Sequence, residues 1–311
     1  MSRMYWHRLK NRLSFQRWSQ LGFFLLINSY AKGFQSGQIF AGASKSICVP
    51  VLNCYSCPGA LGACPIGALQ TVLGRGRFPF YVLGLMMAFG VVLGRAICGL
   101  LCPFGLVQDL LHKIPLPKYQ LPPRFDRALR WLKYIVLALL VVLLPLLVAI
   151  QSGIATPYFC KWLCPAGTLG GALPLMALNP SMRALAGFLF SWKFAIMLLI
   201  LLAAMTISRP FCRYLCPLGA FYALLNKVSL FGMKVDKHKC VSCGKCAKAC
   251  KMDVDVTKAP DHTECIRCGM CVRACPTKAV SFRYGFGNGK ETDRPAEKTE
   301  TPKQISDTEK E

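Results

Sequence analysis

Eight cysteines near the C-terminal end of the chain share one spacing, and that spacing suits iron-sulfur chemistry. The two runs are Cys240, Cys243, Cys246, Cys250 and Cys265, Cys268, Cys271, Cys275. In a C-x2-C-x2-C-x3-C run, three thiolates can hold three corners of one cubane if the chain curls tightly around it, and the fourth is directed at a neighbouring cluster. Disulfides and zinc sites do not require this even spacing. The runs therefore predict two [4Fe-4S] clusters.

The expected ligand sets of these two clusters are crossed between the runs. One set is Cys240, Cys243, Cys246 and Cys275, and the other is Cys265, Cys268, Cys271 and Cys250. Pro276 follows the second run, as this pattern expects, whereas Lys251 replaces proline after the first. That departure concerns the turn rather than the ligands. We expect residues 236–284 to form a small α+β two-cluster domain of the bacterial ferredoxin kind.

Further cysteines occur in a motif that is repeated four times. The copies are Cys64-Pro-Ile-Gly, Cys102-Pro-Phe-Gly, Cys164-Pro-Ala-Gly and Cys216-Pro-Leu-Gly. Cys98, Cys160 and Cys212 stand four residues ahead of three copies, and the first copy is preceded at wider spacing by Cys54 and Cys57. Cysteines four apart lie on one helical face or line one tight turn, and the proline prevents the preceding backbone from continuing as regular helix. Each motif can therefore offer two thiolates to one cluster.

The elements that position these motifs must be largely membrane helices. Apolar residues make up 54% of the 311 residues and charged residues only 17%, which is too apolar for an ordinary pair of soluble domains. The net charge is +24, but Asp109 and Asp126 are the only acidic residues before Asp236. Segments that exclude carboxylates, with Lys and Arg clusters beside apolar runs, explain this charge better than nucleic-acid binding does. The cysteine content indicates a reducing, cytoplasmic location for the C-terminal end.

Four apolar runs predict about four transmembrane helices. They are Leu21–Ala31, Phe78–Gly94, Tyr134–Ile150 and Leu185–Ile207. Crossing a hydrocarbon core of about 30 Å takes roughly 20 apolar residues. Basic residues precede the first run and no small-residue cleavage site follows it, which favours a cytoplasmic segment at residues 1–17 over a signal peptide. Alternation then places the two-cluster domain on the cytoplasmic side of the inner membrane, followed by a tail at 285–311 whose composition predicts disorder.

This topology assigns the four motifs to opposite membrane faces, with motifs one and three outside and motifs two and four inside. We expect a tandem repeat of two helices within residues 18–235, with one further [4Fe-4S] cluster near each face. The outer ligands would be Cys57, Cys64, Cys160 and Cys164, and the inner ligands Cys98, Cys102, Cys212 and Cys216. Cys54 is an alternative to Cys57. The competing interpretations are small buried apolar side chains, or a disulfide for Cys48 and Cys54.

Other redox cofactors lack their residues in this sequence. All four histidines lie outside the predicted spans, so paired ligands for a membrane b-type haem are missing; they are His7, His112, His238 and His262. There is no C-x-x-C-H haem attachment site, and no glycine-rich loop follows a strand to bind a dinucleotide. Electron transfer would therefore depend on iron-sulfur clusters, and we assign no catalytic residue.

From Arg17 to Tyr284 the chain resembles the NapH-type membrane polyferredoxins, whose relatives include the nitrous-oxide regulator NosR and the oxidase-assembly protein CcoG. The resemblance rests on the C-x3-C-P motifs followed by the two-cluster runs. It implies an electron-transfer component of an oxidoreductase system rather than a stand-alone enzyme. Its partners would be a quinone pool, a soluble ferredoxin or flavodoxin, or a membrane or extracytoplasmic redox protein. The alternatives are a redox factor for assembly or regulation of another oxidoreductase, and a bare membrane anchor.

Overall fold

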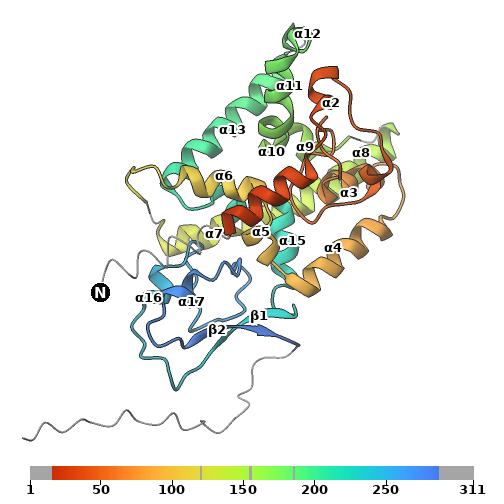
Figure 1. Ribbon diagram of the computed structural model, residues 1–311. Coiled ribbons are helices and arrows are strands. Elements are labelled where there is room, and N and C mark those ends of the chain that lie inside the picture. Colours follow the sequence, from red (N-terminus) through yellow and green to blue (C-terminus); the bar gives the residue numbers. More distant parts are fainter. Residues whose placement is uncertain (1–15, 120, 154–155, 185, 287–311) are drawn as a thin grey trace, which may run out of the picture.

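The computed structural model shows a helical part that stands above a small unit containing a two-stranded sheet (Figure 1). It describes residues 16–119, 121–153, 156–184 and 186–286. The predicted basic segment and the predicted disordered tail lie outside these ranges, apart from positions 16–17 and 285–286.

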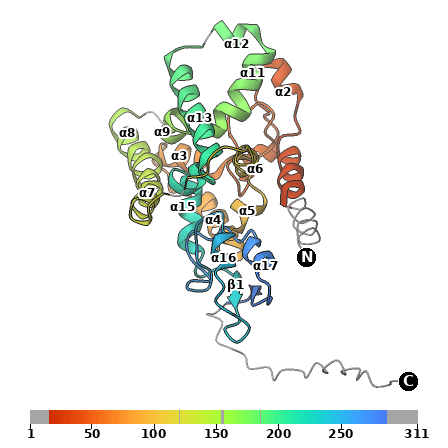
Figure 2. The same cartoon turned by 90° about the vertical axis from the view of Figure 1, so that its left-hand side faces the viewer.

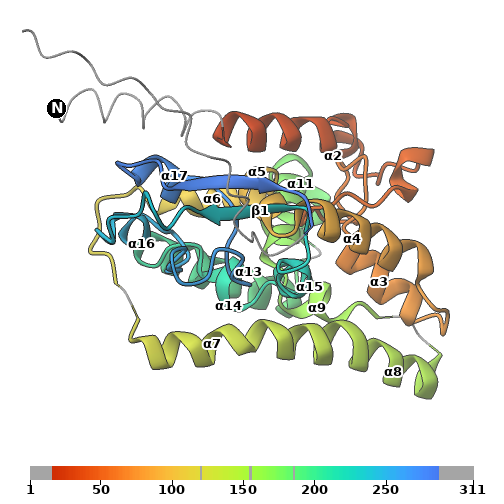
Figure 3. The same ribbon diagram turned by 90° about the horizontal axis from the view of Figure 1, so that it is seen from below.

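The helical part begins with a helix over residues 16–27 and continues with mostly short helices. The elements that follow are α2 (Lys32–Ser36), η1 (Ala43–Ser46), α3 (Pro65–Leu73), α4 (Phe80–Leu93), α5 (Ala96–Leu100) and α6 (Pro103–Leu111). Next come α7 (Pro123–Val136), η2 (Leu137–Leu143), α8 (Leu144–Ser152), α9 (Tyr158–Trp162), α10 (Pro165–Gly167), η3 (Thr168–Ala172) and α11 (Leu173–Leu178). The last are α12 (Pro180–Ala184), α13 (Phe188–Thr206), α14 (Pro210–Tyr214) and α15 (Pro217–Leu225). The first helix and the α7–α8 helix lie on opposite sides of the bundle (Figures 2 and 3).

Two helices in the described ranges are long and apolar enough to cross a membrane. One is the continuous helix Pro123–Gln151, of 29 residues, and the other is α13, of 19 residues. The remaining predicted spans are shorter, since α4 has only 14 residues, about 21 Å at 1.5 Å per residue. Gly94 follows α4 with a positive φ of 55°, a conformation that glycine adopts readily and that ends the helix. Four full-length spans are therefore not confirmed in the described residues, where Phe80–Leu93 and Pro165–Leu178 are shorter apolar helices.

Three of the four C-P dipeptides separate two helices, and the first, at Cys64, follows a loop. The four C-P cysteines have extended backbone with ψ between 111° and 129°, and the proline is the first residue of the next helix. Proline fixes φ for helix initiation and disfavours helical geometry in the residue before it. As predicted, the preceding helix cannot continue through the motif. The thiol therefore lies at a helix N-terminus, where the positive end of the helix dipole stabilises an anionic ligand.

The C-terminal unit pairs two strands and repeats one loop conformation. β1 (Phe231–Val235) and β2 (Val280–Tyr284) are antiparallel, and α16 (Lys245–Lys248) and α17 (Met270–Ala274) lie between them in sequence. Gly244 and Gly269, at φ 67° and 74°, precede the two short helices at the same place in each cysteine run. Since β1 pairs with β2, the unit includes residues before the predicted boundary at 236.

Candidate iron-sulfur sites

In the C-terminal unit the structure brings the first crossed set of cysteines together. Cys240, Cys243, Cys246 and Cys275 line one cavity of about 240 Å³. The backbone N–H of Ala279 donates to Cys275 Sγ at 3.2 Å. Three thiols from one run and one from the other therefore surround a common space, with a donor already aimed at a sulfur.

The second crossed set lies on the side of the unit that contacts the helical part. Its members are Cys250, Cys265, Cys268 and Cys271. Burial, together with the neighbouring thiols Cys268, Cys265 and Cys250, raises the pKa of Cys271 to about 12. Thiols that affect one another in this way lie close together, and binding to iron would deprotonate them. Cys250 and Cys268 also pack against the core of the helical part.

Motifs two and four converge inside the helical part, and we call their cysteines the inner group. Cys98, Cys102, Cys212 and Cys216 line one narrow cavity. All four are buried, with at most 8% of each residue exposed. The backbone N–H of Gly219 donates to Cys216 Sγ at 3.4 Å, and the side chain of Gln108 donates to Cys212 Sγ at 3.1 Å. Four thiols with donors directed at sulfur suit cluster ligands better than apolar packing residues.

Motif three meets the first motif at a larger cavity of about 410 Å³. The cysteines that line it, here called the outer group, are Cys54, Cys64, Cys160 and Cys164. The expected ligand Cys57 is not in the lining, and its thiol donates instead to the carbonyl of Gly170 at 3.5 Å. Cys54 and Cys57 belong to one tight turn, closed by a 3.1 Å bond from the Cys57 N–H to the Cys54 carbonyl, which directs their side chains differently. The structure therefore places Cys54, the alternative, rather than the expected Cys57 at this cavity.

The cysteine groups are not arranged for a single metal ion or for disulfides. In the part of the chain that the structure describes, no three His, Cys, Asp or Glu side chains are close enough to share one ion. A cubane carries its irons at separate corners, so its thiolates stand farther apart than the ligands of one zinc ion. All eighteen cysteines are free thiols, including Cys48 and Cys54. The donor sets thus fit [4Fe-4S] clusters.

The outer and inner groups are neighbours. Leu52 lines both cavities. The next residue, Asn53, also lines the outer cavity. The two groups therefore lie close together, which the expected assignment to opposite membrane faces does not by itself predict. The loop before the first motif folds inward, which the periodicity of the apolar runs cannot reveal.

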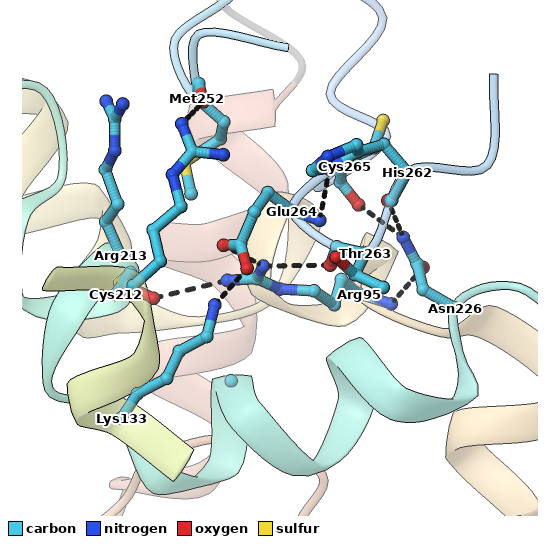
Figure 4. A network of polar contacts seen from close by, with 12 residues as sticks. Arg95, Lys133, Cys212, Arg213, Asn226, Met252, His262, Thr263, Glu264 and Cys265 are labelled. Atoms are coloured by element: carbon cyan, nitrogen blue, oxygen red, sulfur yellow. Dashed lines mark hydrogen bonds and ion pairs between the residues drawn. The ribbon is translucent and has the colours of Figure 1, made fainter. Parts of the chain in front are cut away.

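A buried ion-pair network joins the inner group to the C-terminal unit (Figure 4). Arg95 lines the inner cavity and donates to Glu264 Oε2 at 2.7 Å and to the Cys212 carbonyl at 3.2 Å. Lys133 pairs with the other oxygen of Glu264. Burial alone would raise the pKa of Glu264, but the charges of Arg95 and Lys133 lower it to about 2. Because Glu264 precedes Cys265, the network holds the second crossed set against motif two.

A second buried arginine repeats this arrangement in motif four. Arg209 donates to both oxygens of Asp109, at 2.9 and 2.7 Å, and to the carbonyl of Cys98 at 2.9 Å. Arg95 and Arg209 each stand three residues ahead of the first cysteine of their own motif, and each donates to the first cysteine of the other. Neither arginine was predicted as a site residue. The shared pattern R-x-x-C-x3-C-P-x-G is the signal that could have identified them.

Comparisons with known proteins agree with the cysteine chemistry. A family model described as a 4Fe-4S binding domain matches residues 78–122, 136–173 and 188–238. A second model with the same description matches residues 259–281. Together they cover motifs two to four and the second cysteine run of the C-terminal unit. The chain therefore binds [4Fe-4S] clusters.

Individual relatives place the chain in a family. It is 31% identical to an uncharacterized protein, MJ0750, of Methanocaldococcus jannaschii over 72% of this chain and 87% of the relative. It is 27% identical to the ferredoxin-type protein NapH of Haemophilus influenzae, over 57% of this chain and 55% of the relative. It is 32% identical to the regulatory protein NosR of Pseudomonas aeruginosa, over 51% of this chain and 20% of the relative. No solved structure matches the chain. The chain is a member of the NapH- and NosR-type polyferredoxin family.

Proposed function

We propose that this membrane protein conducts electrons along four [4Fe-4S] clusters, from one redox partner at the C-terminal unit to another at the outer cavity, or in reverse. When bound, each cluster supplies one-electron exchange, and the protein sets its potential through hydrogen bonds and burial. One observation carries the proposal: the four cysteine groups are consecutive neighbours. Leu52 lies between the outer and inner groups, and Arg95 joins the inner group to the loop of Cys265.

The exposure of the groups supports entry and exit at the two ends. Cys243 of the C-terminal unit is exposed, whereas every cysteine of the inner group is buried. At the other end, the exposed side chain of Lys161 lies on the lining of the outer cavity. We infer that partners exchange electrons at these ends, and that the inner group is shielded from them.

The remaining details of location and partners are part of this proposal. Basic side chains gather at the α7 end that contacts the C-terminal unit, which is the positive-inside pattern of a cytoplasmic face; they include Arg124, Arg127 and Arg130. We therefore place the C-terminal unit on the cytoplasmic side of an inner membrane that the chain crosses more than once. A soluble ferredoxin or flavodoxin fits the C-terminal unit as partner, and a quinone or an extracytoplasmic redox protein fits the other end.

The test assigns clusters first and electron flow second. Protein purified without oxygen should contain about 16 iron atoms per chain. Cys102→Ser and Cys216→Ser should each remove the same cluster signal, and Cys64→Ser a different one, while Cys48→Ser, a buried thiol in none of the groups, removes none. When the C-terminal unit is reduced chemically, the outer cluster of Cys102→Ser should be reduced much more slowly than that of the unsubstituted protein.

Two outcomes would contradict this proposal. Equal rates of outer-cluster reduction with and without the inner cluster would show that the inner group is not on the route. Normal cluster content without sustained quinol- or ferredoxin-linked turnover, together with poor cofactor content in another oxidoreductase, would favour a regulatory or assembly factor, as the name of the relative NosR suggests.

A further inference from the structure

A fully buried glutamine contacts one sulfur of the inner group. Gln108 follows Cys102 by six residues and lies on α6. Its Nε2 donates to Cys212 Sγ at 3.1 Å, and its Oε1 accepts the backbone N–H of Phe211 at 3.1 Å. The Phe211 N–H can only donate, so the amide oxygen must face it and the amide N–H groups must face the sulfur.

The same arrangement recurs at the outer group. Gln70 follows Cys64 by six residues, lies on α3 and is fully buried. Its Nε2 donates to Cys160 Sγ at 3.4 Å, and its Oε1 accepts the N–H of Phe159 at 2.9 Å. In both cases a glutamine behind one C-P cysteine contacts the first cysteine of the motif that shares its cavity.

The backbone explains why these two sulfurs take a side-chain donor. A C-P cysteine precedes a helix, so free N–H groups of the first turn point at its sulfur, as Gly219 does for Cys216. Cys212 instead lies at the third position of α14, after a proline without an N–H and after Phe211, whose N–H bonds to Gln108 Oε1. Cys160 likewise lies at the third position of α9. In both places the N–H that contacts the sulfur comes from a glutamine on another segment.

We propose that Gln108 and Gln70 set the reduction potentials of the inner and outer clusters, respectively, each through its N–H···S bond. The inference rests on the proposed function, since it takes the two groups as cluster ligands. Reduction adds negative charge to a cluster and its thiolates, so a donor at sulfur stabilises the reduced form and raises the potential. Hydrogen bonds to charged groups are stronger than those between neutral groups, so the loss of one is expected to shift the potential measurably.

The experiment is a redox titration of each cluster, followed by electron paramagnetic resonance in protein purified without oxygen. Cys212→Ser and Cys160→Ser identify the inner and outer signals. Gln108→Leu should make the inner cluster at least about tenfold harder to reduce at a fixed potential, a shift of about 59 mV to more negative values for one electron. The outer cluster should be unchanged. Gln70→Leu should do the reverse, so each variant is the control for the other.

A second pair of variants tests the donor role of the glutamine amide separately from its acceptor role. At alkaline pH, Gln108→Glu and Gln70→Glu present an ionised carboxylate, which still accepts the phenylalanine N–H but offers no hydrogen to the sulfur. If the Leu variants lose their cluster, the Glu variants should retain it at a lowered potential. Unchanged potentials in variants that keep both clusters, or equal shifts of both signals in each variant, would overturn the proposal. The titration needs no electron flow between clusters. It would therefore still test this inference if the proposed electron transfer along the four clusters were wrong.

Discussion

Each buried arginine beside the inner group is paired with a carboxylate. Arg95 faces Glu264, and Arg209 faces Asp109, so each buried guanidinium has a carboxylate at 2.7 Å. Removing one partner of such a pair leaves an uncompensated buried charge, which typically costs 3–5 kcal/mol. Lys251 adds a bond to Asp109 at 2.9 Å. This lysine stands where a proline was expected, and its ion pair explains how the first run tolerates the change.

Glu264→Gln should weaken the attachment of the C-terminal unit in a pH-dependent way. The carboxylate has a pKa of about 2 in the folded protein against about 4.3 when unfolded, which is worth about 3 kcal/mol. That contribution is present above pH 4.3 and is lost as the pH falls towards 2. Thermal unfolding of the two proteins should therefore differ at neutral pH and converge in acid. Asp236→Asn, a half-exposed carboxylate outside this ion-pair network, is the control; a constant difference at all pH values would contradict the assignment.

Cys54→Ser should remove the same cluster as Cys164→Ser, because both sulfurs line the outer cavity. Cys57→Ser, three residues away and equally conservative, should keep that cluster, since its thiol contacts Gly170 instead. Iron content and the outer signal measure the effect. Loss of the outer signal in Cys57→Ser with retention in Cys54→Ser would restore the ligand set expected from the sequence.

At the scale of elements, the sequence predicted what depends on local chemistry. The cysteine spacing predicted both crossed sets, and Pro103 and its counterparts predicted the breaks between helices. Contacts between distant segments were not predictable in this way. The proximity of the outer and inner groups depends on the loop at Leu52, which Tyr222 helps to hold by donating to the carbonyl of Pro50 at 3.1 Å. Neither this loop nor Tyr222 belongs to a repeated sequence motif that could have predicted the contact.

Helix α5 packs so closely on the C-terminal unit that only glycine fits at Gly99. A Cβ there would come within 2.4 Å of the backbone oxygen of Ile266, in the loop between Cys265 and Cys268. Gly99→Ala should therefore displace this loop and cost about 1–3 kcal/mol. Limited proteolysis should release the C-terminal unit sooner.

Gly84→Ala, on α4, is the matched control for Gly99→Ala. A Cβ at Gly84 meets nothing within 4 Å, and replacing a helical glycine by alanine favours the helix by about 0.5–1 kcal/mol. Equal proteolysis of both variants would mean that the close approach at Gly99 can relax without moving the loop.

For the whole molecule, the proposed topology puts the two ends of the cluster series on opposite sides of the membrane. After the clusters are removed, an impermeant thiol reagent should label the exposed Cys243 in inverted membrane vesicles, and the outer-cavity thiols from the other side. Single Cys→Ser changes at Cys243 and Cys54 identify the labelled sites. Labelling of both from one side would exclude a route across the membrane.

The exchange of contacts between motifs has a consequence for biosynthesis. Gln108 must wait for Cys212, 104 positions later, and Gln70 for Cys160, 90 positions later. At about 5–20 residues per second, the ribosome needs several seconds to supply each missing partner. The early thiols therefore enter the membrane without their full set of partners, exposed to oxidation and to stray metal ions. Insertion of the inner cluster must follow translation of the last motif, and a chain truncated before α14 could complete neither the inner group nor the C-terminal unit.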